Sequence, residues 1–146
     1  MLLALQFIAT LSTTLFCGAA IYINLVEHPA RMGCTTEIAA TVWAPSYKRA
    51  TAMQATLAIL GFACGVTAWL MGSGLWWLVG GLLIGAVVPF TFAVIMPTNH
   101  RLLEPGRDLA SNETRSLLEK WGNLHAVRSA LSFAASVLYV GLLLGA

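Results

Sequence analysis

The chain has 146 residues, of which 58% are hydrophobic and only 10% are charged, and its formal net charge is +2. An average soluble domain contains about 25% charged residues, so this composition excludes an ordinary soluble protein and indicates an integral membrane protein. The small net charge also gives no reason to expect nucleic acid as a partner.

Four stretches of the chain are apolar enough to cross a bilayer. Residues 2–26, 50–100 and 129–146 contain no Asp, Glu, Lys or Arg, and a spanning helix needs about 20 apolar residues. The middle stretch is too long for one helix, and the glycine turn in "MGSGLWW" divides it. We predict an all-α fold in a single transmembrane domain, residues 1–146, with helices at about 3–28, 49–71, 75–97 and 121–144 and a short surface helix at about 112–120.

These spans predict a four-helix bundle with unequal ends. Both termini and the short hairpin at residues 72–74 lie on one side, and two longer polar loops, about 29–48 and 98–120, lie on the other. All charged residues, eight basic and six acidic, fall on the loop side or at the adjoining helix ends. The positive-inside rule therefore predicts cytoplasmic loops and outside termini, and we expect a bacterial inner membrane.

The first predicted helix carries a polar stripe. Its members recur in steps of 3, 4 or 7 residues and share one face: Gln6, Thr10, Thr13, Cys17, Asn24 and His28. Glu27 lies beside this stripe. Aligned polar residues in a spanning helix face the bundle interior or a cavity. Pro29 predicts that the helix ends or bends just after His28, and Arg31 is then expected to contact lipid headgroups.

The second and third predicted helices carry packing signals. "GFACG", residues 61–65, and "GLLIG", residues 81–85, are typical of close helix packing. Such faces could pack within one chain or between copies of the chain in a homo-oligomer. Pro89 lacks the backbone donor that would reach Gly85, which predicts a kink at about residues 88–91.

The fourth predicted helix repeats the pattern of the first. Trp121, His125, Arg128, Ser132 and Tyr139 share one face. Only 18 residues follow Arg128, which is short for a span, so His125 and Arg128 belong to the last turns at the membrane boundary. Anchoring at the bilayer interface is the alternative explanation for the tryptophan and the arginine.

The predicted topology brings three helix ends to one level of the bundle. That level holds all three histidines of the chain and four other polar residues. Together they are Asn24, Glu27, His28, Asn99, His100, His125 and Arg128. An imidazole can act as a general base, and Asn and Arg side chains can hold a developing oxyanion or enolate. We expect pairing across helices, His28 with Arg128 or Glu27 with His125 or Arg128, around an apolar pocket open to a flat substrate from the lipid bilayer.

Two other uses of the same residues stay open. His28, His125, His100 and Glu27 could ligate iron, copper or zinc, and two of the histidines could ligate haem in a membrane redox protein. A small transporter or an assembly factor is the third possibility, in which the polar stripe lines a permeation path.

Three segments resemble the anthrone oxygenase-like family of small four-helix membrane proteins: "FCGAAIYINLVEHPAR", "MPTNHRLL" and "WGNLHAVRSALSFAA". The resemblance covers nearly the whole chain. It implies an oxygenase or oxidase that acts on a flat, anthrone-like aromatic substrate with dioxygen as co-substrate and without a dissociable organic cofactor. The residues alone leave open whether the protein is an enzyme, and the resemblance favours one.

Combined with the resemblance, the residues yield a candidate site. We expect catalytic roles for four residues: His125, Arg128, His28 and Glu27. We expect substrate contacts from four others: Asn24, Asn99, Trp121 and Tyr139. No cofactor is assigned, and haem, iron or copper stay as alternatives.

Overall fold

The computed structural model describes residues 1–145, and within that range it contains helices and no strands. Ala146, the last residue of the predicted domain, lies outside the described residues. Four helical spans are long and apolar enough to cross a membrane: Leu2–Met32, Thr36–Leu70, Leu75–Leu102 and Asn112–Leu143. The predicted all-helical, membrane-spanning four-helix bundle is confirmed.

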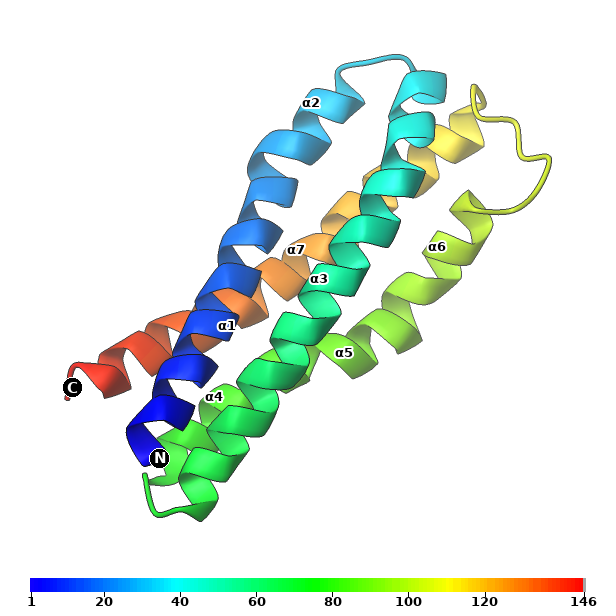
Figure 1. Ribbon diagram of the computed structural model, residues 1–146. Helices are drawn as coiled ribbons and strands as arrows, with labels where there is room; N and C mark the ends of the chain where they lie inside the picture. The colour runs from blue at the N-terminus through cyan, green and yellow to red at the C-terminus, as the bar shows by residue number, and fades with distance from the viewer. Residues whose placement is uncertain (146) are drawn as a thin grey trace.

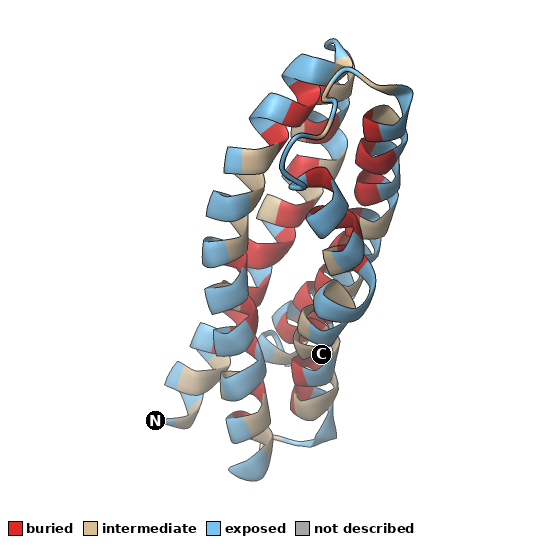
Figure 2. Cartoon of the chain, turned by 90° about the vertical axis from the view of Figure 1, so that its right-hand side faces the viewer, coloured by how far each residue is buried: buried red, intermediate tan, exposed pale blue. Residues whose placement is uncertain are grey.

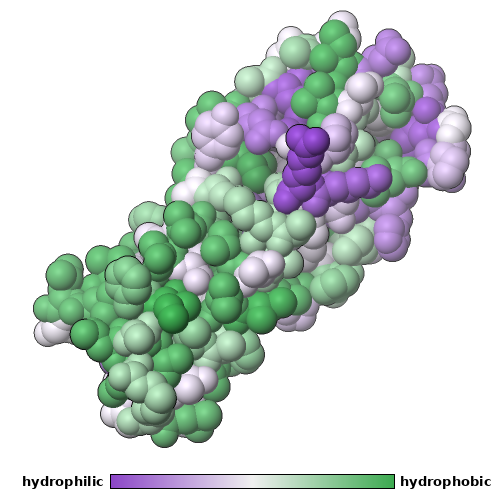
Figure 3. All heavy atoms as spheres, in the orientation of Figure 1, coloured by the Kyte–Doolittle hydropathy of each residue, from purple (hydrophilic) through white to green (hydrophobic). Residues whose placement is uncertain are grey.

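The two ends of the bundle differ in connection and in polarity. Both termini and the turn between the second and third spans lie at one end, and the other two connections lie at the opposite end (Figure 1). Gly72 and Gly74 form the first turn with φ of +91° and +92°, a conformation that favours glycine. Hydrophilic residues gather at the opposite end, which we call the loop end (Figure 3).

The first span is one continuous helix with a wider turn inside it. It consists of α1 (Leu2–Tyr22), the π-helical turn η1 (Ile23–Glu27) and α2 (His28–Met32). The N–H of His28 donates to the carbonyl of Ile23, five residues earlier. The predicted helix end at His28 was wrong, because the wider turn makes room for Pro29, which has no N–H and whose ring crowds the preceding turn.

The third span is interrupted twice. It consists of α4 (Leu75–Gly85), α5 (Val87–Phe90), a second π-helical turn η2 (Thr91–Ile95) and α6 (Met96–Leu102). The break after Gly85 matches the kink predicted from Pro89, and the span changes direction around α5 (Figure 1). The second π turn precedes Pro97, just as the first precedes Pro29.

The second and fourth spans are longer than predicted. The helices α3 (Thr36–Leu70) and α7 (Asn112–Leu143) have 35 and 32 residues. At 1.5 Å per residue each is about 50 Å long, well beyond a hydrocarbon core of about 30 Å. Residues 36–48, predicted as loop, belong to α3, and the predicted surface helix at about 112–120 is the first part of α7, capped by the Ser111 hydroxyl.

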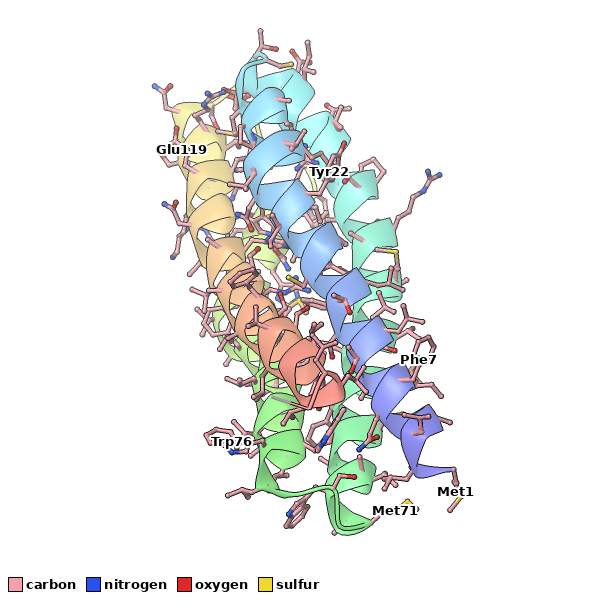
Figure 4. The ribbon with its side chains drawn as sticks, turned by 90° about the vertical axis from the view of Figure 1, so that its left-hand side faces the viewer. Met1, Phe7, Tyr22, Met71, Trp76 and Glu119 are labelled. Carbon is pink, nitrogen blue, oxygen red and sulfur yellow. The ribbon has the colours of Figure 1, made fainter. Side chains whose placement is uncertain are left out.

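An apolar core explains why these extensions are helical. Near the loop end, residues of the first three spans such as Trp43 and Leu102 pack against Leu118 and Trp121 at the start of α7. Inward faces are buried along the whole bundle (Figure 2), whereas apolar side chains such as Phe7, Tyr22 and Trp76 point outward (Figure 4). A second cluster, which includes Phe16, Ala58 and Ala135, fills the middle of the bundle.

Tyr139 occupies a niche of glycines near the hairpin end. Its ring stacks on Trp77 at 5.0 Å between centroids, and its hydroxyl donates to the Trp77 carbonyl at 3.2 Å. A Cβ at Gly65 would lie 1.8 Å from that hydroxyl, and one at Gly80 would lie 2.3 Å from the ring. Gly65 of a predicted packing seam and Gly80, just before the other seam, therefore admit this side chain within a single chain.

This niche predicts that Gly65→Ala lowers the free energy of unfolding by about 1–3 kcal/mol, as overpacking does elsewhere. Thermal unfolding in detergent measures the change. Gly18→Ala is the matched control, because a Cβ there meets nothing within 4 Å among residues 1–145 and alanine favours a helix. Equal melting temperatures for the two variants would contradict the packing described. Adding Tyr139→Phe to the Gly65→Ala variant removes the hydroxyl that the new Cβ meets, and should restore part of the lost stability.

Candidate functional site

Asn24 joins the first span to α7 through three hydrogen bonds. Its Nδ2 donates to the carbonyl of Gly122 at 3.0 Å, and its Oδ1 accepts from the Ser129 hydroxyl at 2.6 Å. The same Oδ1 lies 2.7 Å from Nδ1 of His125. Because a carbonyl can only accept, Gly122 determines which way the Asn24 amide faces.

That orientation determines the proton position on His125. Asn24 Oδ1 can only accept, so Nδ1 of the neutral His125 ring carries the hydrogen and Nε2 keeps the lone pair. His125 is only 1% exposed and is surrounded by α7, η1 and α3. The ring is therefore oriented as a general base with Nε2 as the basic atom.

Aromatic rings cover this base on the side of the loop end. Trp121 contacts both His125 and His28, with ring centroids 4.9 Å and 5.2 Å away. Trp43 meets Trp121 edge-on at 5.8 Å. His28 also packs on Gly122, where a Cβ would lie 2.5 Å from its Nε2. The rings separate His125 from the water expected at the loop end.

Arg128 is a buried cation beside this base. Its guanidinium donates to Oε1 of Gln54 at 2.7 Å and lies over the Phe16 ring at 5.4 Å. Within residues 1–145 it forms no ion pair, and neither its Nε nor the Nε2 of Gln54 has a hydrogen-bond partner. A buried charge without a counter-charge is unfavourable, so this position suits an anionic ligand. We call Asn24, Gln54, His125, Arg128 and Ser129 the polar layer.

Glu27 faces α3 and not α7. It forms an ion pair with Arg31 and accepts a hydrogen bond from the Ser46 hydroxyl. The predicted pairings of His28 with Arg128 and of Glu27 with His125 or Arg128 do not occur in the described chain. Arg31, predicted to reach lipid headgroups, is buried instead. The helix continues past Pro29, and this continuation turns Arg31 inward.

The remaining candidate residues form no hydrogen bond with the polar layer in the described chain. Asn99 is fully buried on α6, and neither of its amide atoms has a partner within the described chain. His100 is exposed on the same helix, and Tyr139 lies in the glycine niche. Among residues 1–145 no three His, Cys, Asp or Glu side chains come close enough to hold a metal ion, so the predicted ligand set is not assembled.

Two small cavities adjoin the polar layer. One of about 10 Å³ is lined by Gln54, His125 and Arg128 among others, and one of about 70 Å³ is lined by Phe16, Gln54, Met96 and Arg128 among others. About 10–15 Å³ admits a water molecule, whereas small-molecule sites usually have about 300 Å³ or more. A diatomic or water-sized molecule fits here, and an aromatic ligand requires the walls to move.

Sequence reasoning missed Gln54 and Ser129. Gln54 was visible as a strongly polar residue inside a charge-free run of about fifty residues, but its single occurrence forms no stripe. The predicted face that begins at Trp121 omits Ser129, although this residue comes four residues after His125 and so lies beside it on the helix. Their partners, Arg128 for Gln54 and Asn24 for Ser129, lie on other helices, and spacing along one helix does not show such contacts.

Comparison with known proteins places the chain in a family. Residues 43–138 match the family model described as anthrone oxygenase. The chain belongs to the anthrone oxygenase family. The matched segment contains Gln54, Asn99, His125 and Arg128, whereas Asn24 precedes it.

Curated relatives extend the match over most of the chain. It is 27% identical over 143 residues to anthrone oxygenase tpcL of Aspergillus fumigatus, covering 91% of this chain and 89% of the relative. It is 26% identical over 147 residues to an anthrone oxygenase of Claviceps purpurea, covering 90% and 83%. No solved structure matches the chain. At the level of the family its function is that of an oxygenase, and the fungal relatives give no support for a bacterial membrane.

The contacts of Glu27 predict a structural role that a double variant can isolate. Glu27→Gln leaves Arg31 buried without its counter-charge, and we expect a loss of about 2–3 kcal/mol, below the usual 3–5 because Glu27 is 30% exposed. Adding Arg31→Met should restore most of the stability, as followed by denaturant unfolding in detergent.

The exposed Glu119→Gln is the matched control and should change stability by less than about 1 kcal/mol. Recovery of stability without recovery of oxygenase turnover in the double variant would contradict a purely structural Glu27.

Proposed function

We propose that the protein is a membrane-embedded oxygenase that converts a flat, anthrone-like aromatic ketone to the corresponding quinone with dioxygen at the polar layer. The observation that carries the proposal is the His125 ring, held by Asn24 with Nε2 basic, next to Arg128, a buried cation with no counter-charge among the described residues. The names of the two relatives support the substrate class.

The first step is a proton transfer. Nε2 of His125 removes a proton from the methylene group that lies opposite the ketone. Asn24 Oδ1 continues to accept from Nδ1–H and stabilises the imidazolium that forms. The negative charge moves to the ketone oxygen, where Arg128 and the free amide N–H of Gln54 can donate to it.

The second step is oxidation of the enolate by dioxygen. Electrons pass from the enolate carbon to dioxygen, a C–O bond forms there, and the peroxide takes up one proton. Loss of the second methylene proton then breaks the O–O bond and forms the new C=O group. One oxygen atom enters the quinone and the other leaves as water, so atoms and electrons balance without another oxidant.

The surrounding residues fit supporting roles in this scheme. Trp121 and His28 form an aromatic wall that keeps water from the carbanion. Asn99, buried and unpaired within the described chain, is a further candidate donor to the substrate. The contacts of Tyr139 support a role in packing, because its hydroxyl bonds to backbone carbonyls. The glycine seams are filled within one chain, so they do not support a homo-oligomer.

The orientation in the membrane follows from charge. Seven of the eight Lys and Arg residues lie in the half of the bundle toward the loop end, and Arg128 lies near the middle of α7; this distribution supports a cytoplasmic loop end and outside termini.

Cys34, exposed in the turn between α2 and α3, tests this orientation. A membrane-impermeant maleimide should label it only after intact cells are opened. In a chain with Cys34→Ser, Met71→Cys at the hairpin end is the counterpart and should be labelled in intact cells. Labelling in the reverse order would contradict the orientation.

Oxygen uptake with an anthrone tests the activity directly. His125→Gln and Arg128→Lys should each lower turnover by about 100-fold or more, because one removes the base and the other the planar donor to the enolate. His100→Ala is the matched control, since His100 is exposed on α6 and should leave turnover unchanged. Melting temperatures in detergent show whether each variant is folded.

Unchanged turnover in both folded variants would remove the proposed site. The visible spectrum and metal content of the purified protein distinguish direct oxidation of the enolate from the rival haem or metal hypothesis. A Soret band or stoichiometric iron or copper would contradict direct oxidation.

A further inference from the structure

A groove of about 610 Å³ opens on the outer surface between α3 and the interrupted third span. Its walls are uncharged and apolar throughout, with Ile59 and Phe62 on one side and Leu82 and Pro89 on the other. These residues belong to the part of the chain without Asp, Glu, Lys or Arg, so the groove faces lipid. Its volume falls within the range of about 300–1,000 Å³ that small-molecule sites occupy.

The groove adjoins the polar layer through shared wall residues. Ala58 and Val88 line the groove and also the cavity of about 70 Å³ behind it. Gln54 and Arg128 line that cavity and also the cavity of about 10 Å³ that His125 lines. The three cavities therefore follow one another from the lipid side to the proposed base.

The kink explains why the groove lies at this position. The helix is interrupted after Gly85, and Pro89 cannot donate a hydrogen bond to the Gly85 carbonyl. The wall around α5 thus has fewer backbone hydrogen bonds than the continuous helix α3 opposite it. We expect a passage between Ala58 and Val88 to open by movement of the wall around α5.

We propose that this groove is the entry and first binding site of the substrate, an uncharged, flat aromatic ketone that reaches the protein through the bilayer. The ligand enters between α3 and α5 with its methylene group leading toward His125, and its carbonyl follows to Gln54 and Arg128. The identity of the substrate class rests on the proposed function, whereas the route rests on the order of the cavities.

Binding without turnover tests the groove separately from the activity. A fluorophore is attached at Ala86→Cys, in the groove, in a chain whose own three cysteines are replaced by alanine and which is held in liposomes. Anthraquinone, the oxidised ring system, is then added without oxygen. We expect saturable quenching at position 86 and only linear quenching at Ala134→Cys, an exposed position on α7 that does not line the groove.

Blocking the groove tests its part in turnover. Ala86→Trp fills an exposed position in the groove wall and should lower kcat/KM for the anthrone by about tenfold or more. Ala134→Trp should leave kcat/KM unchanged. Ala126→Trp blocks a second groove, of about 540 Å³, which His28 and Asn24 line near the loop end, and should have the smaller effect.

The outcomes separate the two proposals. Equal quenching at positions 86 and 134 would show partition into lipid and would overturn the groove as a binding site. A loss of kcat/KM in Ala126→Trp with none in Ala86→Trp would overturn the route. Saturable quenching at position 86 in a protein that consumes no oxygen would uphold the groove and contradict the proposed function.

Discussion

The Asn24 amide is the contact on which the arrangement of the polar layer depends. This one side chain forms hydrogen bonds with a backbone carbonyl, a hydroxyl and an imidazole of α7. These bonds fix the distance between the two spans and the proton position on His125. Loss of any of these partners leaves a buried polar group without a hydrogen bond, so the geometry is strongly constrained. The π turn that contains Asn24 makes the contact possible, and such turns are frequent at functional sites.

Much of this fold follows from hydropathy and from simple topology. Charge-free runs predict four spans, an even number of spans brings the histidine-bearing helix ends to one end of the bundle, and periodicity turns Asn24, His125 and Arg128 inward. These features depend on burial and on helix geometry, which a single sequence expresses directly. The glycines around Tyr139 were also visible as packing seams, but the side chain that fills them was not, because helices pair through contacts that spacing does not encode.

The features that sequence reasoning missed share a physical cause. Periodicity assumes a uniform α-helix, whereas the π turns before Pro29 and Pro97 each shift the phase of the helical turns after them. Buried positions therefore step by five residues from Ile23 to His28, and Arg31 turns inward to meet Glu27. The long extensions of α3 and α7 were missed for a different reason: a hydropathy window stops where charges begin, although a separate apolar core keeps both segments helical.

A base and an uncompensated cation thus lie enclosed between two apolar clusters, in a member of a family of oxygenases. The central claim is that the substrate carbonyl binds at Arg128 and Gln54 while His125 stays bonded to Asn24. An experimental structure determined without oxygen and with anthraquinone bound tests this claim most directly. We predict a quinone oxygen within hydrogen-bond distance of the Arg128 guanidinium, and the ring plane pointing toward α5. A quinone held against His28 and Glu119, with Arg128 still bonded only to Gln54, would contradict it.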